Sequence, residues 1–343
     1  MNTRSPLLQT GQRLFRDRFT LERPLGRGAN GVVWLARDNT LHTQRALKCI
    51  PVDQEHRLQL DLLRVEAGRS QQLTHANIVR VFDYFEDADL AALSMEFIDG
   101  FTLRQALNAF HRDDGPAFFE HKHIHHWVVQ WLEALHYAHA QGIVHCDLKP
   151  ANLMVSSGTD QLKVTDFGIA QSLTDHHRLS GASGTLAYMS PQRLQGAVPT
   201  VLDDIYAIGA TLHELLTGQT PVAVHGIPPT IDESRLDRGI ERSLPVPAPW
   251  VAGIEACLEK DPANRPQSIE DVAAALDLEE ATLPVYRAKP SPSRIVHQLE
   301  TGDEEVDDND RTILIEVVAE PLPSTTTPQP GRRFFSFAVA ALI

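Results

Sequence analysis

The apolar positions of the chain follow two different periods. From about Phe19 to about Leu93, short runs of β-branched and apolar residues are broken by Gly and Asp, which is typical of strands. One stretch with helical spacing, between Glu55 and Leu73, interrupts these runs. This part of the sequence predicts a small lobe built mostly of β-strands.

From Thr102 onward the apolar residues recur at helical spacing. Two series predict buried helix faces: Ile124, Val128, Trp131 and Leu135, and then Ile205, Ile208, Leu212 and Leu215. We interpret the tryptophans in the first series as core residues and not as part of a cofactor site. The whole pattern predicts an α+β fold with two lobes, of which the second is larger and helical.

The composition changes after about Leu278. Residues 279–331 are rich in Pro, Ser, Thr and acids, and such a segment cannot bury enough apolar surface to pack. We interpret them as a flexible, acidic, juxtamembrane-like linker. The acidic run from Asp303 to Asp310 is interpreted as solvated linker and not as a docking motif.

Residues 332–343 hold a basic pair followed by ten apolar or small residues. A bilayer takes roughly 20 residues to cross, but arginines before an apolar run are typical of the cytoplasmic flank of a membrane helix. We therefore expect a transmembrane helix that begins near Phe334 and anchors the chain to the inner cell membrane. The alternative is a short apolar end that packs or frays.

Charge and cysteine content exclude several classes of partner and of structural site. The formal net charge of -14 over 343 residues gives no basic field, so nucleic acid is not expected as a partner. Cys49, Cys146 and Cys257 are far apart and form no CxxC pair, which predicts neither a disulfide framework nor a zinc site. The first residues lack the apolar run of a secretory signal, so we expect a cytoplasmic domain.

The first candidate site is the glycine-rich stretch LGRGANGVV. Gly26, Gly28 and Gly31 would let the backbone approach a phosphate chain closely, and Val33 can lie over an adenine. A GxGxxG also marks dinucleotide-binding folds, but there it opens a helix. Here VVWLARD continues as a strand, which favours a glycine-rich flap over phosphates, with an ordinary glycine hairpin as the alternative.

A candidate ion pair follows this stretch. Lys48 lies on the next expected strand and Glu66 on the expected helix. A lysine ammonium needs an opposite charge to aim it at phosphates, and Glu66 can supply that charge. Either residue alone could equally be a solvated surface charge.

The strongest chemical signal is GIVHCDLKPANLMV, followed by LKVTDFGIA. Phosphoryl transfer needs phosphates and metal ions held in line with an acceptor hydroxyl. Asp147 can orient that hydroxyl and accept its proton, Lys149 can neutralise the moving phosphoryl group, and Asn152 can hold a metal ion. Asp166, a hard oxygen ligand suited to magnesium, comes between an expected strand and the flexible Gly168.

These motifs, together with GTLAYMSPQ and DDIYAIGATLHELLTG, resemble those of the eukaryotic-like (Hanks-type) Ser/Thr protein kinases in order and spacing. The residues within these motifs resemble those of the bacterial membrane-linked branch of that family. The resemblance implies an N-terminal extension over residues 1–18 and a kinase domain over 19–278, with an N-lobe over about 19–95 and a C-lobe over about 99–278.

The resemblance also implies the cofactors and partners. ATP and Mg²⁺ are the expected cofactors, with Mn²⁺ as an alternative metal, and Ser or Thr hydroxyls of proteins are the expected acceptors. A homodimer and attachment to a membrane through the C-terminal end are further expectations. A small-molecule kinase of related fold is disfavoured because GTLAYMSPQ resembles a platform for protein substrates.

Further roles come only from the resemblance. It implies an adenine pocket lined by Leu25, Val33 and Ala46, with Met95 at its back and a hinge from Glu96 to Ile98 whose backbone binds the purine. It also implies that His145 and Phe167 form a buried pair. Thr185 corresponds to the residue that bridges Asp147 and Lys149, and Asp204 to the helix acid that holds the catalytic loop from beneath. Lys149 and Thr185 resemble the Ser/Thr arrangement, so a tyrosine kinase is the lesser alternative.

Two residues depart from the family pattern. Cys146 stands where kinases switched on by loop phosphorylation usually have arginine, so a phosphate on the following segment lacks that charged partner. We therefore expect activity without such a phosphate, and an inert thiol in preference to a redox switch.

The second departure is Gln192, which stands in place of a glutamate that usually pairs with an arginine, here Arg265. Because an amide brings no charge, we expect a looser substrate-docking loop. This change keeps open a weakly catalytic pseudokinase that binds nucleotide or partners.

Overall fold

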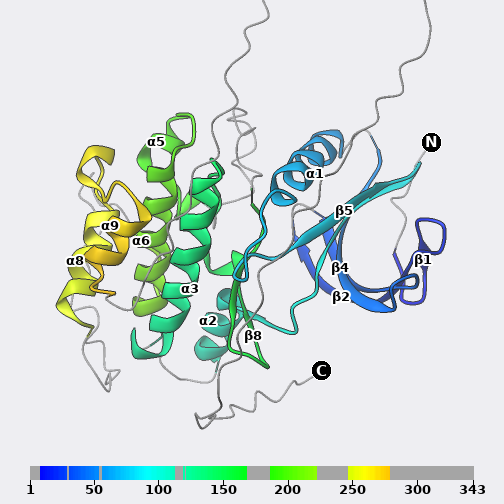
Figure 1. Ribbon diagram of the computed structural model, residues 1–343, viewed down its shortest axis with the longest axis horizontal. Coiled ribbons are helices and arrows are strands. Elements are labelled where there is room, and N and C mark those ends of the chain that lie inside the picture. The colour runs from blue at the N-terminus through cyan, green and yellow to red at the C-terminus, as the bar shows by residue number, and fades with distance from the viewer. Residues whose placement is uncertain are drawn as a thin grey trace, which may run out of the picture. The chain divides into compact units, whose positions relative to one another are not determined.

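Six strands near the start of the chain form one antiparallel sheet (Figure 1). The computed structural model describes residues 8–28, 31–53, 56–112, 119, 121–167, 186–221 and 246–278. The order across the sheet is β1 (Arg13–Leu14), β2 (Phe19–Gly28), β3 (Gly31–Asp38), β4 (Thr43–Pro51), β6 (Leu90–Glu96) and β5 (Val81–Glu86).

The sheet includes residues that precede Phe19, the expected start of the domain. Arg13 pairs with Thr20 across β1 and β2, and the Leu14 side chain is buried in an apolar cluster of this sheet. Part of the expected extension over residues 1–18 therefore belongs to the folded lobe. Two paired residues are too few for an alternating pattern to reveal them in the sequence.

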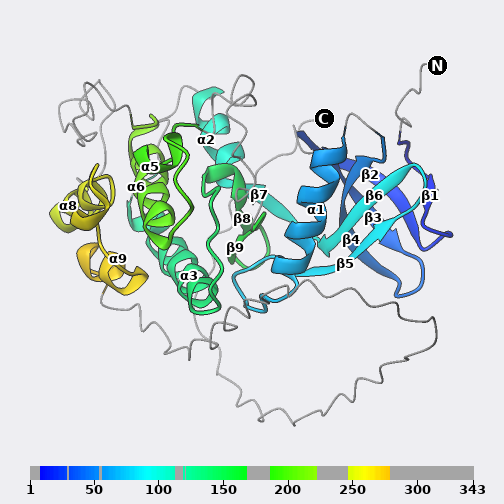
Figure 2. The same cartoon turned by 90° about the horizontal axis from the view of Figure 1, so that it is seen from above.

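Helix α1 (Arg57–Ser70) packs against β5 and β6 of the sheet, as Figure 2 shows. Leu60, Leu63 and Ala67 are buried and recur at helical spacing, so they form the face that meets the sheet. The helix predicted between Glu55 and Leu73 is confirmed, with ends inside the expected range.

The rest of the described chain is mainly helical, with a small sheet of β7 (Gly100–Thr102), β8 (Leu153–Ser156) and β9 (Leu162–Val164). The α+β fold with a β-rich lobe and a helical lobe is confirmed. The helices are α2 (Leu103–Arg112), α3 (His121–Ala140), α5 (Pro191–Leu194), α6 (Val201–Thr217), α8 (Ala248–Cys257) and α9 (Ile269–Ala275), with short 3-10 turns at Pro150–Asn152 and Pro262–Asn264.

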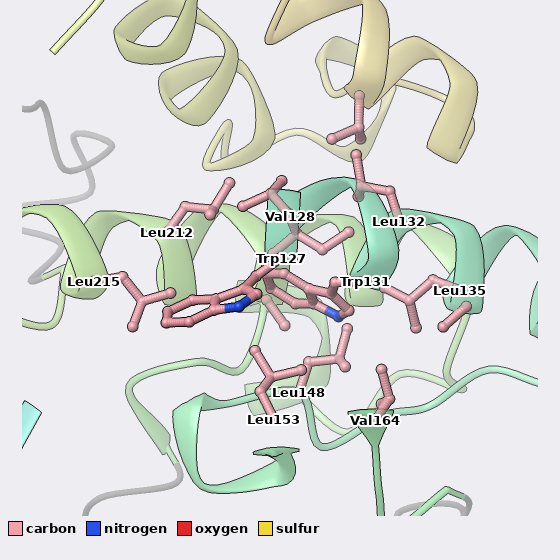
Figure 3. Packing of buried hydrophobic residues seen from close by; sticks show 14 of the residues in the cluster. Trp127, Val128, Trp131, Leu132, Leu135, Leu148, Leu153, Val164, Leu212 and Leu215 are labelled. Atoms are coloured by element: carbon pink, nitrogen blue, oxygen red, sulfur yellow. The ribbon is translucent and has the colours of Figure 1, made fainter. Parts of the chain in front are cut away.

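The core of the helical lobe lies between α3 and α6. Figure 3 shows Trp127 and Trp131 among Leu212 and Leu215 and, on another side, the three residues Leu148, Leu153 and Val164. Every member of the two apolar series predicted from the sequence is at most 2% exposed. The tryptophans are core residues, as the periodicity predicts.

Helix α6 has clear start and stop signals in the sequence. The backbone N–H of Thr200 donates to the Asp203 carboxylate over 2.7 Å, which satisfies a donor at the helix start. Gly218 ends the helix with a φ of 73°, a conformation that glycine adopts without strain. The helix is thus fixed at both ends, and it carries Asp204 to the site described below.

Several predictions fall outside the described residues. Gly168 and Thr185 do so, as do the linker over 279–331 and the apolar end over 332–343. Within the part of the chain that the structure describes, no helix has both the length and the apolar character that a bilayer crossing requires.

Candidate active site

The glycine-rich stretch forms the hairpin between β2 and β3, where Gly28 pairs with Gly31. Gly31 has a φ of 112°, and a Cβ atom there would lie 2.4 Å from the Cys49 carbonyl oxygen on β4. The fold itself therefore requires glycine at this position. A Cβ atom at Gly26 would meet nothing within 4 Å, so packing against the described protein atoms does not explain that glycine.

Lys48 joins two carboxylates that are distant in the sequence. Its Nζ donates to both Glu66 oxygens over 3.0 and 2.8 Å, and to Asp166 Oδ1 over 3.1 Å. Lys48 is 6% exposed and Glu66 2%. The three N–H groups of the ammonium are thus all used, and β4, α1 and the end of the β9 segment meet at this nitrogen.

Lys48 and Asp166 stabilise each other's charge. Burial alone would raise the pKa of Asp166, but the Lys48 ammonium holds it below its usual value. Burial would also lower the pKa of Lys48, but the Asp166 and Glu66 carboxylates raise it above its usual value. Asp166 is therefore ionised at neutral pH, as a metal ligand must be.

Asp147 is held from two sides within the loop that precedes β8. Lys149 Nζ donates to its two carboxylate oxygens over 3.0 and 2.8 Å. Asn152 Nδ2 donates to the Asp147 carbonyl over 2.7 Å and to its carboxylate over 3.2 Å. Because the amide nitrogen serves Asp147, the amide oxygen of Asn152 is the atom left to face a metal ion.

A backbone contact links this loop to Asp166. The N–H of Thr165 donates to the Asn152 carbonyl over 3.0 Å, so the residue before Asp166 is fixed to the loop that carries Asp147. The structure therefore brings Asp147, Lys149 and Asn152 together with the segment that carries Asp166.

His145 and Phe167 form the buried pair that was expected. Their rings are 4.6 Å apart, and they are 0% and 1% exposed. His145 Nε2 lies 2.9 Å from the Thr165 carbonyl, and its Nδ1 accepts from the Asp147 N–H over 3.2 Å. This pattern fits the neutral ring with its hydrogen on Nε2. The His145 side chain thus connects the loop that carries Asp147 with the segment that carries Asp166.

Asp204 contacts the backbone of the loop that carries Asp147 and is 0% exposed. It accepts from the backbone N–H groups of His145 and Cys146, each over 2.8 Å, and His139 Nε2 lies 2.8 Å from its Oδ2. Burial alone would raise the pKa of Asp204, but His139 and the loop donors hold it below its usual value. Sequence reasoning missed His139, since nothing sets it apart from the neighbouring histidines.

The family is decided by comparison with known proteins. The protein kinase domain matches residues 19–275. The chain belongs to the protein kinase domain family.

Its curated relatives include bacterial Ser/Thr kinases. The chain is 36% identical over 279 residues to the serine/threonine-protein kinase PkaA of Streptomyces coelicolor, covering 76% of this chain and 49% of that protein. It is 34% identical over 277 residues to the serine/threonine-protein kinase PknB of Mycobacterium leprae, covering 76% and 42%. A probable serine/threonine-protein kinase PknB of Lactococcus lactis is 36% identical over 219 residues, covering 63% and 34%. The chain thus spans about half the length of these relatives or less.

The apolar residues expected around adenine lie in one cluster of the kinase domain. Ala46, Met95 and Ile98 are buried in it, and Leu25 and Val33 pack against them. Met154, from β8 of the helical lobe, joins the same cluster. Sequence reasoning missed Met154, although its place two residues after Asn152 on the following strand was a usable signal.

Glu96, at the start of the expected hinge, is held by one backbone hydrogen bond and one ion pair. The N–H of Glu96 donates to the Arg80 carbonyl over 2.8 Å, and Lys163 Nζ donates to the Glu96 carboxylate over 3.0 Å. The start of the hinge is therefore tied to the residue that precedes β5 and to β9.

The expected pairing of Gln192 with Arg265 is present. Arg265 Nη2 donates to Gln192 Oε1 over 2.6 Å, and Gln192 Nε2 donates to the Lys260 carbonyl over 2.8 Å. Arg265 is 3% exposed, and it also donates to the backbone carbonyls of Leu202, Glu259 and Lys260. The oxygen and the nitrogen of the Gln192 amide each form a hydrogen bond. These contacts give no support for the looser substrate-docking loop that the sequence predicts.

Cys146 is half-buried and has a φ of 71°, which is uncommon for a residue other than glycine. Burial, together with the Asp204 charge, raises the pKa of its thiol to about 12. The thiol is therefore protonated at neutral pH, which agrees with the expectation of an inert cysteine.

Proposed function

We propose that this protein is a Ser/Thr protein kinase that transfers the γ-phosphate of ATP to Ser and Thr hydroxyls of proteins, in signalling. Protein kinases use ATP with a divalent metal ion. The observation that carries the proposal is the joint placement of two groups: Lys48 bound to Glu66 and Asp166, and Asp147 bound to Lys149 and Asn152.

The metal-holding residues are proposed to be Asp166 and Asn152, with Mg²⁺ as the ion and Mn²⁺ as the alternative. Their donor atoms are a carboxylate and an amide oxygen, which suit hard cations. Among the described residues no group of three or more His, Cys, Asp or Glu side chains could hold a metal unaided. This fits Mg²⁺, which usually binds through one or two carboxylates plus the phosphates of the substrate, whose charge the ion neutralises.

The remaining residues divide the work of transfer. Lys48, aimed by Glu66, would steady the phosphates under the loop of Gly26, Gly28 and Gly31, with the purine against the apolar cluster and the hinge backbone. Asp147 would orient the acceptor hydroxyl and take its proton, and Lys149 would stabilise the moving phosphoryl group. His145, Phe167 and Asp204 would hold the loop, and a bridge by Thr185 belongs to the same proposal.

The cellular setting is also proposed. A cytoplasmic kinase domain, an inner-membrane anchor beginning near Phe334 and a homodimer follow from the sequence and from the resemblance to bacterial membrane-linked kinases. A kinase domain that ends near residue 278 and is followed by the linker is part of this proposal, with β1 (Arg13–Leu14) included in the folded lobe.

Phosphate transfer tests the proposed function. The chain is incubated with γ-labelled radioactive ATP, Mg²⁺ and myelin basic protein, and the labelled protein is hydrolysed to amino acids. We expect label in phosphoserine and phosphothreonine, and loss of label when EDTA removes the metal. Label in phosphotyrosine alone would indicate a tyrosine kinase, and absence of label would leave a nucleotide- or partner-binding pseudokinase.

A further inference from the structure

The charge of the chain is distributed unevenly. Residues 1–45 hold eight arginines, no lysine, two aspartates and one glutamate, which gives this segment a formal charge of +5. Since the whole chain carries -14, the residues after Arg45 carry -19. A segment whose charge is opposite to that of the rest of the protein indicates a surface for an anionic partner.

Strand pairing places three of these arginines on one face of the sheet. Arg13 of β1 and Arg37 of β3 both pair with Thr20 of β2, so the three residues form one row across the strands. Arg23 pairs with Leu35, which lies two residues before Arg37 on β3 and therefore on the same face. Arg13 and Arg37 also line one pocket. The arginines are thus gathered in space as well as in sequence.

We call Arg13, Arg16, Arg23 and Arg37 the basic strip, of which Arg16 lies in the turn between β1 and β2. All four residues are exposed. Among the described residues, the side chains of Arg16, Arg23 and Arg37 form no hydrogen bond or ion pair. Contacts within the described chain therefore do not explain why arginine occupies these positions.

Two acids beside the basic strip offset part of its charge. Asp17 lies 3.8 Å from Arg13 in a loose ion pair, and the two side chains are 68% and 64% exposed. Glu22 is half-buried and lines the same pocket. Asp38, the third acid of the segment, is 1% exposed and pairs with Arg18, which is outside the strip. The four arginines of the strip thus outnumber the two acids beside them.

The chemistry of the basic strip fits the phosphates of an anionic lipid surface. A guanidinium presents its donors as a fork that matches phosphate oxygens, and the segment has arginine but no lysine. The cytoplasmic leaflet of a membrane is anionic and attracts clustered basic residues. The same surface repels the acidic remainder of the chain, so only an orientation with the strip toward the lipid is favourable.

We propose that the basic strip binds the phosphate groups of an anionic phospholipid surface and so orients the β-rich lobe against a membrane. The inference goes beyond the proposed phosphate transfer, and it does not require the anchor proposed near Phe334. None of the four arginines is among the residues proposed for ATP, metal or acceptor. Binding to lipid and phosphate transfer can therefore be tested separately.

Vesicle flotation tests this inference. The full chain is mixed with vesicles of phosphatidylglycerol and phosphatidylcholine in equal parts, or of phosphatidylcholine alone, and the bound fraction is measured over a series of lipid concentrations. In about 0.1 M salt, the parent is expected to bind the anionic vesicles at least about 10-fold more strongly than the neutral ones. Raising the salt to about 1 M is expected to remove the difference, because salt screens the charges.

A double substitution assigns the binding to the basic strip. Arg23→Gln with Arg37→Gln is expected to weaken binding to anionic vesicles by about 10-fold or more. Binding to neutral vesicles is expected to be unchanged, because residues 332–343 are the same in both proteins. Arg57→Gln with Lys260→Gln is the matched control: it removes the same charge from two exposed residues, on α1 and after α8. The control is expected to bind like the parent.

Several results would overturn the inference. These are equal binding of the parent to anionic and neutral vesicles, or equal losses for the strip variant and the control. Binding to a single-stranded oligonucleotide without binding to vesicles would assign the strip to nucleic acid instead. A dimer in solution that the strip variant alone dissociates, without lipid binding, would assign it to a second copy of the chain.

Phosphate transfer without vesicles is measured on the same proteins. The strip variant is expected to keep the parent rate within about two-fold, since its substitutions lie outside the proposed site. If it does not fold, Arg13→Gln with Arg16→Gln decides the question by the same comparison. An inactive parent that binds anionic vesicles would overturn the proposed function alone, whereas an active parent that does not bind them would overturn the inference alone.

Discussion

Asp147→Asn is expected to lower the rate of phosphate transfer by about 100- to 10,000-fold, the range for loss of a general base. The parent carboxylate accepts two hydrogen bonds from Lys149 and one from Asn152. The asparagine amide has nearly the same shape but no charge, so it can neither orient the acceptor hydroxyl strongly nor take its proton. One of its two positions would also carry an NH₂ group that faces the Lys149 ammonium.

The rate is measured at saturating ATP and acceptor, so that binding does not mask the chemical step. Asp89→Asn is the matched control, because Asp89 is an exposed residue in the turn between β5 and β6. We expect the control to retain the parent rate. Equal rates for Asp147→Asn and the parent would exclude Asp147 as the base.

Asp204→Asn is expected to lower the free energy of unfolding by roughly 3 kcal/mol, the usual effect of breaking a fully buried charged network. The Asp204 carboxylate accepts from His145 N, Cys146 N and His139 Nε2. An asparagine offers one acceptor oxygen, so its NH₂ group must face at least one of these donors. The catalytic loop would lose a fixed position, and kcat is expected to fall at least about 10-fold.

The loss of stability is measured by urea unfolding at several pH values. Because the pKa of Asp204 is lowered in the folded protein, its charge contributes stability at neutral pH that is lost as the pH falls through the acid range. The difference between the parent and Asp204→Asn is therefore expected to shrink toward low pH. A difference that is the same at every pH would show that the charge of Asp204 does not stabilise the loop.

Those parts of the fold that depend on local patterns could be predicted from the sequence. The period of Ile124, Val128, Trp131 and Leu135 identifies one face of α3, and all four are buried. The pairing of Lys48 with Glu66 followed from motif order, because each side chain has a role only in the presence of the other. The geometry agrees, with the closest contact at 2.8 Å.

Contacts between distant residues could not be predicted in this way. His139 binds Asp204 across 65 residues and Arg104 binds Glu214 across 110, and neither pair forms a local motif. A histidine or arginine on a helix is most often a surface residue, so the sequence alone offers no reason to choose these two. Their partners are set by how α2 and α3 pack against α6.

Gln192 shows a different limit. The sequence places an uncharged amide opposite Arg265 where a glutamate is usual, and from that alone we expect a weaker contact between residue 192 and Arg265. The structure adds the Lys260 carbonyl, which accepts from the Gln192 amide over 2.8 Å and which a glutamate at this position could not bind. A backbone acceptor of this kind is invisible in the sequence, because any residue at 260 would present it.

Asp166 is proposed to hold metal-bound ATP, whereas Asp147 is proposed to orient the acceptor hydroxyl. Calorimetric titration of the parent, Asp166→Asn and Asp147→Asn with ATP in the presence of Mg²⁺ tests this division most directly. We expect the parent to bind, Asp166→Asn to bind at least about 10-fold more weakly because a charged metal ligand is lost, and Asp147→Asn to stay within about three-fold of the parent. Equal affinity for all three proteins, or no binding by the parent, would contradict these roles of Asp166 and Asp147.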